Sequence, residues 1–505
     1  METGPVIDMP VYAGCRPATM TSPQDALNRD FIGWVWYEKD VWGAGRQLDP
    51  GLRNRLSAVN NTLTLEALPP GTIQYMTDRS RYPAGYFVQN TNFDFFNYAG
   101  IHRPVLLYTT PKTHIDDITV ETTFSDNIGE HPRNVSLCTL LLTKQQAWTI
   151  IQAYSEDRDR LCIVYPLHVG IGPVKCHQHT SGFSSSPSKQ TPTVRLQIGV
   201  NKTRGTADTP RFVSQIRGKG FDWPVVVKDF NLMKWMGANS FRTSHYPYAE
   251  EILQMADRHG IVIIDECPGV GIKDIRSFGN VSLAHHLTVM EELVRRDKNH
   301  PSVVMWSVAN EPASEMPPAG FYFKELVSHT RSLDSSRPVT YITASNYARD
   351  LGAPYVDVIC VNSYFSWYQD PGHTELIGLQ LNTQFDNWYG KYQKPIIQSE
   401  YGADAVPGLH SDPPMMFTEE YQKTVLQNYH NVFDQKRKEF VIGELIWNFA
   451  DFMTSQSIIR VVGNKKGIFT RQRQPKAGAF LLRERYWRIA NETGVLPTWA
   501  RYPCL

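Results

Sequence analysis

The C-terminal part of the chain alternates short apolar runs with longer segments of mixed polarity. Eight runs are short and apolar enough to be buried strands, at residues 194–200, 238–244, 261–266, 303–311, 338–343, 357–364, 394–400 and 441–449. Eight strand–helix alternations over about 300 residues are typical of a (β/α)8 barrel, whose active site lies at the C-terminal ends of its strands. We therefore predict an α/β fold with a TIM barrel at residues 194–505.

The segments between these runs have helical periodicity. In residues 223–237, Val226, Phe230 and Met233 recur at helical spacing, and Gly237 suits the end of the helix. The spacing predicts a helix that packs one apolar face on the barrel.

The first 193 residues are less regular. From about residue 30 to residue 110, short aromatic runs such as "FIGWVWYEKDVW" are separated by Gly and Pro turns, which is typical of a β-sandwich. Farther on the pattern decays, and "GPVKCHQHTSGFSSSPSKQTPTV" has little apolar periodicity. We predict an incomplete β-sandwich at residues 1–113 and a diverged or irregular segment at residues 114–193.

Two of the predicted strands end in an acid. The run "VVMWSVANEP" finishes with Asn310 and Glu311, and "KPIIQSE" finishes with Glu400 in the same position relative to its strand. A carboxylate at the end of a buried strand costs desolvation unless it is paired or solvated. Two glutamates that converge at a barrel mouth are the minimal equipment for cleaving a glycosidic bond. The alternative for either residue is a strand-end glutamate in a salt bridge.

Composition and charge exclude several other functions. The hydrophobic content is 41%, the charged content is 20% and the formal net charge is +1. The sequence also has no run of like charge long enough to indicate binding to a nucleic acid or a membrane surface. No apolar run approaches the roughly 20 residues that span a bilayer. The seven cysteines form no CxxC pair, so we predict neither a metal site nor a cofactor. The start "METGPVIDMP" lacks signal-peptide features, although N-x-S/T sequons would suit a glycoprotein.

Five barrel segments carry recognisable signatures. "GANSFRTSHYPY", "IVIIDECPGVG", "VVMWSVANEP", "KPIIQSEYGA" and "ELIWNFADF" resemble, in order and spacing, the glycoside hydrolase family that includes β-galactosidase, β-mannosidase and β-glucuronidase. The resemblance is almost continuous from residue 216 to residue 493, and it returns on the N-terminal side over "NNTLT" and from "PPGTIQY" to "LLYTTP". It implies a retaining exo-hydrolase with Glu311 as acid/base and Glu400 as nucleophile.

The resemblance also implies roles for other residues. Asn310 would bind the 2-hydroxyl of the sugar, Arg242 and Tyr364 would position the nucleophile, and Asp94 would reach the site from the first domain. Trp447, on the eighth predicted strand, suits a platform on which a sugar stacks, with a core tryptophan as the alternative.

A basic loop follows the last predicted strand. In "RVVGNKKG", Arg460, Asn464 and Lys466 lie close together in a polar segment expected outside the core. A uronic acid differs from a hexose by a carboxylate at C6, and two cations with an amide donor supply charge-assisted hydrogen bonds to it. The alternative is a solvated basic loop. In the family, an N-x-K element and a preceding arginine read this carboxylate, so the resemblance implies removal of terminal β-linked glucuronic acid from glycosaminoglycan fragments and glucuronide conjugates.

The chain also departs from the family. Several sandwich strands are absent between "WVWYEKDVW" and "NNTLT", residues 140–193 do not resemble the immunoglobulin-like middle domain, and "GVNK" is followed by "TRGTADTPRFVSQ" instead of a run with a sugar-contacting histidine. These departures predict an N-terminally truncated or alternatively spliced form. Two hypotheses stay open: an active hydrolase, and a catalytically impaired or non-catalytic variant. The resemblance further implies a lysosomal homotetramer.

Overall fold

The computed structural model describes residues 221–494 without interruption. Before them it describes residues 73–75, 77–89, 94 and 95, and strands at residues 7–9, 105–107, 117–123, 135–141, 149–155, 158–164 and 205–208. The chain divides into two compact units. One comprises Met1–Pro10, Val105–Asn201 and Arg295–Asn299, and the other comprises Val11–Pro104, Lys202–Val294 and His300–Leu505. The predicted domain boundaries after residues 113 and 193 stay predictions.

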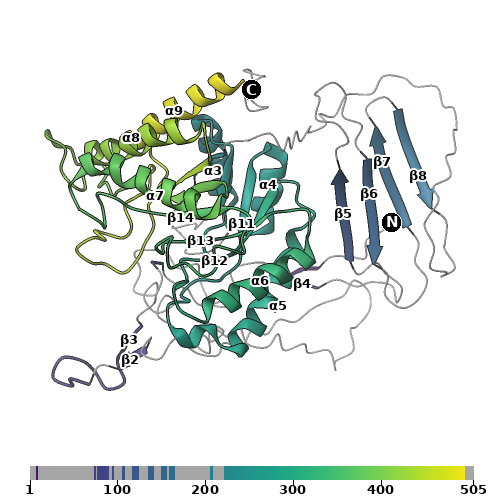
Figure 1. The fold of residues 1–505 in the computed structure, drawn as a ribbon, viewed down its shortest axis with the longest axis horizontal. Coiled ribbons are helices and arrows are strands. Elements are labelled where there is room, and N and C mark those ends of the chain that lie inside the picture. Colours follow the sequence, from purple (N-terminus) through teal and green to yellow (C-terminus); the bar gives the residue numbers. More distant parts are fainter. Residues whose placement is uncertain are drawn as a thin grey trace. The chain divides into compact units, whose positions relative to one another are not determined.

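Apart from Arg295–Asn299, the described residues of the first unit form antiparallel strand pairs. Its pairs are β1 (Ile7–Met9) with β4 (Val105–Leu107), β5 (Asp117–Thr123) with β6 (Val135–Leu141), and β7 (Thr149–Ser155) with β8 (Arg158–Val164). Figure 1 draws β5 to β8 as arrows. The predicted β-sandwich and immunoglobulin-like folds stay predictions, and the Ser-rich segment of residues 172–194 lies outside the described residues.

A closed parallel barrel forms the centre of the second unit. Its strands, in order around the barrel, are β9 (Gly205–Asp208), β10 (Ser240–Arg242), β11 (Val262–Glu266), β12 (Val303–Asn310), β13 (Val339–Thr343), β14 (Ile359–Asn362), β15 (Ile396–Glu400) and β16 (Val441–Ile446). The last strand pairs with the first, Gly443 opposite Gly205. The predicted TIM barrel is therefore confirmed. The unit also contains a separate antiparallel pair, β2 (Ile73–Tyr75) with β3 (Phe87–Gln89).

The first barrel strand differs from the sequence prediction. We expected it at residues 194–200, which lie outside the described residues, whereas the structure places β9 at Gly205–Asp208. Both neighbours, β10 and β16, pair with this four-residue segment through their backbones. Backbone pairing requires no apolar side chain, so a search for apolar runs does not find the sequence "GTAD".

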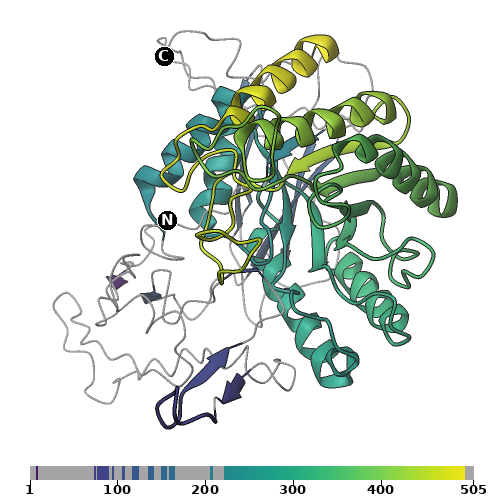
Figure 2. The same ribbon diagram turned by 90° about the vertical axis from the view of Figure 1, so that its left-hand side faces the viewer.

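Helices surround the barrel strands, as Figure 2 shows. They are α3 (Trp223–Met236), α4 (Glu250–His259), α5 (Asn280–Asp297), α6 (Ala319–Leu333), α7 (Ile377–Tyr392), α8 (Glu419–Lys436) and α9 (Ala477–Thr493), with short 3-10 helices η1 (Ile275–Phe278) and η2 (Thr374–Leu376). The helix predicted at residues 223–237 is confirmed, because α3 ends at Gly237 with a φ of 80°, which glycine adopts without strain.

Apolar side chains fill two layers of this unit. Between helices and strands, Phe230 of α3 packs edge-to-face on Phe241 of β10, with ring centroids 6.2 Å apart. A smaller buried cluster includes Ile264 and Met305. Because side chains alternate along a strand, Ile264 lies on the same face of β11 as Glu266. The smaller cluster therefore supports, from within the barrel, the polar residues at the strand ends.

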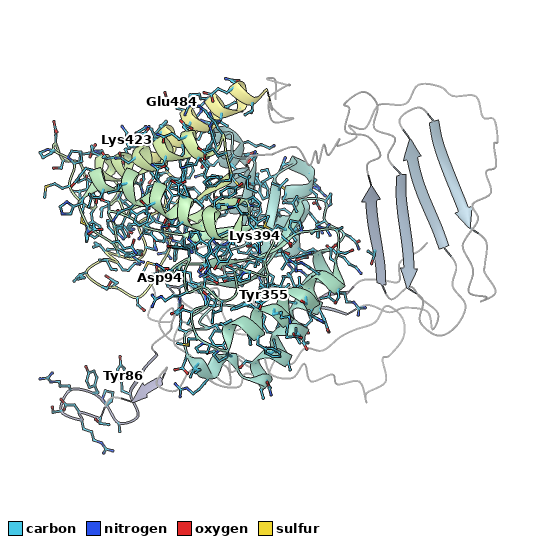
Figure 3. All side chains as sticks on the ribbon, in the orientation of Figure 1. Tyr86, Asp94, Tyr355, Lys394, Lys423 and Glu484 are labelled. Atoms are coloured by element: carbon cyan, nitrogen blue, oxygen red, sulfur yellow. The ribbon has the colours of Figure 1, made fainter. Side chains whose placement is uncertain are left out.

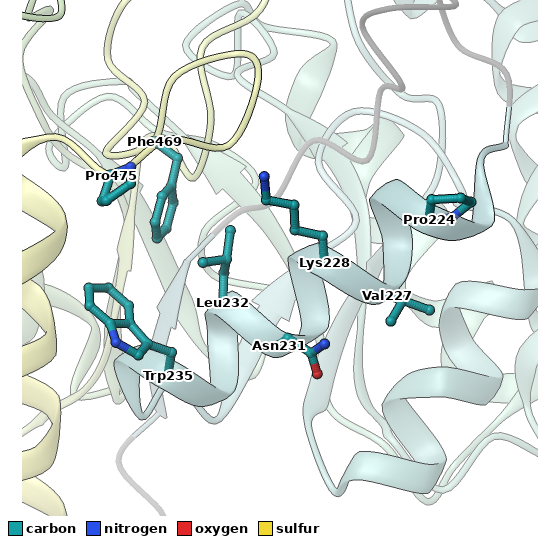
Figure 4. A pocket seen from close by; sticks show the side chains of 8 residues that line it. All are labelled: Pro224, Val227, Lys228, Asn231, Leu232, Trp235, Phe469 and Pro475. Carbon is teal, nitrogen blue, oxygen red and sulfur yellow. The ribbon is translucent and has the colours of Figure 1, made fainter.

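An open apolar pocket of about 400 Å³ lies along α3. Leu232 and Trp235 of this helix line it together with Phe469 and Pro475, as Figure 4 shows. None of the predicted site residues lines this pocket. The candidate site is built elsewhere, at the strand ends.

Candidate active site

Polar side chains end most of the barrel strands. Arg242, Glu266, Asn310, Asn362 and Glu400 are the last residues of β10, β11, β12, β14 and β15. Parallel strands of a barrel end on the same side, so these side chains converge there. The structure thus brings together three predicted residues, Arg242, Asn310 and Glu400, and adds Glu266 and Asn362.

Glu400 is buried and held by two donors. Its side chain is 5% exposed, Oε1 accepts a hydrogen bond from Nη2 of Arg242 at 2.7 Å, and Oε2 accepts one from the Tyr364 hydroxyl at 2.5 Å. Burial raises the pKa of Glu400 to about 7; the charge of Arg242 opposes this rise, the negative charge of Glu311 adds to it, and the Tyr364 hydrogen bond again opposes it. The carboxylate therefore titrates near neutral pH, in a fixed orientation.

Glu311 directly follows β12 and is more open to solvent. Its φ of 43° is in the left-handed region, where a non-glycine residue is strained, and its N–H donates to the Ile342 carbonyl at 2.8 Å. The side chain is 29% exposed; Oε1 accepts from Asn362 at 2.8 Å, and Oε2 lies 3.8 Å from the Lys273 ammonium. The two glutamates therefore differ in environment: one is buried, and the other is reachable from solvent.

Arg242 connects the ends of β12 and β15. Nη2 donates to Glu400 and also to Oδ1 of Asn310 at 3.2 Å, so one guanidinium nitrogen bridges β15 and β12. On its other side, Nε lies 3.4 Å from Oε2 of Glu266. The charges of Glu266 and Glu400 outweigh burial and raise the pKa of Arg242, so this cation stays charged.

The three residues of the predicted basic loop lie close together. Asp94, labelled in Figure 3, accepts hydrogen bonds from Nε of Arg460 at 2.9 Å and from the side-chain amide of Asn464 at 3.0 Å. Arg460 is 9% exposed, whereas Asn464 and Lys466 are fully buried. The expectation that this loop lies outside the core is therefore wrong for these side chains. Burial is possible because each cation has a carboxylate partner.

Lys466 lies in a cage of aromatic rings and one acid. Its ammonium forms an ion pair with Asp404, which is also fully buried, and donates to the hydroxyl of Tyr368 at 3.0 Å. The same nitrogen lies 4.6 to 5.5 Å from the ring centroids of Tyr364, Trp367 and Tyr368. Tyr364 therefore faces both the lysine and Glu400, which makes the basic cluster continuous with the carboxylates.

Trp447 follows β16 beside these groups. It is 4% exposed, its ring centroid is 5.3 Å from that of His245, and the Arg242 guanidinium lies 5.9 Å from it. A ring that is buried against site residues is compatible with both hypotheses, a platform on which a sugar stacks and a core tryptophan. Its predicted role stays a prediction.

Besides Asn362, sequence reasoning missed three other residues that contact the site. Tyr368 accepts hydrogen bonds from Arg460 and Lys466, Asp404 pairs with Lys466, and Glu266 faces Arg242. The sequence does contain a signal for Glu266, because this residue ends an apolar strand as Glu400 does. Tyr368 and Asp404 lie in irregular segments, where no periodicity marks them.

The described part of the chain offers neither a metal-binding cluster nor a membrane-spanning helix. Among these residues, no group of three or more His, Cys, Asp and Glu side chains is arranged to hold a metal ion. None of the described helices is both long and apolar enough to cross a membrane.

The fold and the paired carboxylates together define a class of enzyme. A TIM barrel with one buried and one accessible glutamate at its C-terminal strand ends is a glycoside hydrolase architecture. A family model described as glycosyl hydrolases family 2, TIM barrel domain, matches residues 212–491. The chain belongs to this family.

Individual relatives resemble nearly the whole chain. The β-glucuronidase of Mus musculus is 54% identical over 98% of this chain and 87% of its own length, and that of Homo sapiens is 51% identical over 100% and 88%. Among solved structures, β-D-glucuronidase of Dictyoglomus thermophilum has a TM-score of 0.69 and 42% identity, covering 85% of this chain and 78% of that one. A Ruminococcus gnavus β-glucuronidase in complex with a C6-substituted uronic isofagomine has a TM-score of 0.64 and 32% identity, covering 80% of this chain and 73% of that one.

Proposed function

We propose that this chain is a β-glucuronidase that removes terminal β-linked glucuronic acid with retention of configuration. The observation that carries the proposal is the continuity of two groups: Glu400, held by Tyr364, and the ammonium of Lys466, which faces the ring of the same tyrosine. A sugar whose anomeric carbon lies at Glu400 would direct its C6 substituent toward these cations. A carboxylate there gains charge-assisted hydrogen bonds that a neutral hydroxymethyl group does not.

The two glutamates divide the chemistry. Glu400 attacks the anomeric carbon while Glu311 donates its proton to the leaving oxygen, so the glycosidic bond breaks and a glycosyl ester forms. Glu311, now ionised, takes a proton from water as the water attacks the same carbon, which releases the sugar and restores both groups. Solvent reaches Glu311, which suits a group that exchanges protons, and burial shields the nucleophile.

The names of the relatives support the choice of sugar. All the relatives described above are named β-glucuronidases, and one is in complex with a C6-substituted uronic isofagomine. We extend the proposal, on family resemblance alone, to glycosaminoglycan fragments and glucuronide conjugates as substrates, to a lysosomal glycoprotein, and to a homotetramer. Size-exclusion chromatography with light scattering tests the last of these.

The direct test compares three substrates with the same leaving group. Purified chain is expected to hydrolyse an aryl β-D-glucuronide and to prefer it to the matching β-D-glucoside and β-D-galactoside. Proton NMR of the first-formed sugar should show the β anomer. A folded chain that hydrolyses none of the three would favour the impaired or non-catalytic variant.

Neutralising one cation of the basic cluster should change the sugar preference. Lys466→Gln removes the charge but keeps a donor for Asp404, so kcat/KM for the glucuronide is expected to fall by roughly ten- to more than a hundred-fold. The glucoside should lose far less, because it has no carboxylate to bind. Steady-state kinetics on both substrates measure the difference.

The neighbouring lysine offers a matched control. Lys465 belongs to the same loop, but its ammonium lies 3.6 Å from Asp451 instead of facing Asp404. Lys465→Gln should leave the preference between glucuronide and glucoside unchanged. Equal losses on both substrates for Lys466→Gln would show that Lys466 does not read the carboxylate. Lys466→Ala is a poorer test, since it would leave the buried Asp404 with the more distant Arg460 guanidinium, 3.9 Å away, as its ion-pair partner, at a cost of up to about 5 kcal/mol in stability.

Removing the tyrosine hydroxyl should shift the pH profile. The hydrogen bond from Tyr364 favours the ionised form of Glu400, so Tyr364→Phe raises the pKa of this carboxyl. Because kcat/KM requires ionised Glu400, its acidic limb should move to higher pH, by roughly one pH unit. An acidic limb at the wild-type pH would contradict the assignment of this limb to Glu400.

A further inference from the structure

Glu266 is a buried carboxylate that the mechanism above does not use. It is fully buried at the end of β11. Its Oε1 accepts the backbone N–H of His245 at 2.6 Å, and its Oε2 accepts the Ser307 hydroxyl at 2.8 Å. That same Oε2 lies 3.4 Å from Nε of Arg242. One acid thus joins three neighbouring segments of the barrel mouth.

Arg242 lies between two carboxylates. Its Nε side faces Glu266, and its Nη2 side donates to Glu400 at 2.7 Å. All three side chains are at most 5% exposed, so water screens their charges poorly. A single guanidinium charge is therefore shared, and what one carboxylate gains from it the other loses.

We propose that Glu266 is a positioning residue that draws part of the charge of Arg242 away from Glu400 and so keeps this carboxylate basic enough to attack the sugar. The proposal rests on the proposed function, because it takes Glu400 as the nucleophile. An arginine that served Glu400 alone would favour the ionised form further and leave a weaker base. Glu266 competes with Glu400 for the charge of Arg242. The hydroxyl of Ser307 weakens this competition, because it donates to Oε2, the same oxygen that faces Arg242.

Other titratable groups around this trio are few. Glu311 and Tyr364 face Glu400, Tyr248 faces Arg242, and Asp265 and Cys267 flank Glu266 in the sequence. Cys360 of β14 also faces the pair formed by Arg242 and Glu266. Burial raises the pKa of both thiols, that of Cys360 to about 12, so neither carries charge at working pH. The charges that act directly on Glu400 are therefore those of Arg242 and Glu311, and Glu266 acts through Arg242.

Two substitutions should move the acidic limb of kcat/KM in opposite directions. Glu266→Gln keeps an acceptor for His245 but removes the competing charge, so the pKa of Glu400 falls and the limb moves to lower pH, by roughly half a unit or more. A less basic nucleophile attacks more slowly, so kcat should also fall. Ser307→Ala frees Oε2 for Arg242, which weakens the hold of Arg242 on Glu400 and moves the limb to higher pH.

Glu444→Gln is the matched control. Glu444 is a buried carboxylate of another barrel strand, β16, and forms two hydrogen bonds of 2.7 Å with Arg485 of α9. Its loss should lower the melting temperature and leave the acidic limb in place. An acidic limb that stays at the wild-type pH in Glu266→Gln, or moves the same way in both test variants, overturns the proposal. If Glu266→Gln does not fold, the direction of the limb in Ser307→Ala decides.

A second measurement does not depend on turnover. With carboxyl-13C glutamate incorporated, the signal that disappears in Glu400→Gln reports the ionisation of Glu400 directly. Its titration midpoint should shift down in Glu266→Gln and up in Ser307→Ala. A wild-type chain inactive on every glycoside would overturn the proposed function, whereas unshifted midpoints would overturn the sharing of Arg242.

Discussion

Glu400→Gln is expected to abolish glycoside hydrolysis, with a loss of kcat on the order of 10⁴-fold or more. The amide keeps the size of the side chain but accepts only one of the two hydrogen bonds that Arg242 and Tyr364 donate to Glu400, and it does not attack the anomeric carbon. Hydrolysis of an aryl glucuronide, followed to complete conversion with a large excess of enzyme, measures the remaining rate. A mechanism-based glycosyl inactivator should label the wild type at Glu400, as peptide mass spectrometry would show, and should leave the variant unlabelled.

Glu444→Gln is again the informative control. Because Glu444 pairs with Arg485 away from the carboxylate pair, this change should reduce stability and spare turnover. Label found on Glu311 instead of Glu400 would reverse the two catalytic assignments.

The loss of kcat/KM caused by Glu311→Gln is expected to depend on the leaving group of the substrate. Without an acid at this position, glucuronides of poorly acidic alcohols should lose roughly 10² to 10⁴ in kcat/KM, whereas those of very acidic phenols, which leave without protonation, should lose little. A plot of log kcat/KM against leaving-group pKa should therefore become steeper than in the wild type. A uniform loss across the series would show that Glu311 is not the proton donor.

The polar residues at the ends of the barrel strands could be predicted from the sequence for a physical reason. A buried parallel strand is apolar on both faces, so Glu311 and Glu400 stand out where they interrupt such runs. Seven of the eight barrel strands were found in this way. The strand that was not found is the first one, β9 (Gly205–Asp208). It has no apolar run, because its place is set by backbone pairing with β10 and β16.

The partners of the site residues were less predictable. The loop after β16 was read as polar and external, yet Lys466 is fully buried. Its burial depends on Asp404 and Tyr368, which come from two other segments of the chain. A sequence pattern contains local order only, so it does not show which acid will meet which lysine once the barrel has closed.

The pairing of Lys466 with Asp404 has a consequence for the evolution and redesign of this site. Asp404 comes only four residues after Glu400 and also accepts the backbone N–H of Lys465 at 2.8 Å. The loop that would select the sugar is therefore bound, through Asp404, to the segment that carries Glu400. Grafting a different loop after β16 would leave this acid without its ion-pair partner, so a new sugar preference would have to evolve through coordinated substitutions in both segments.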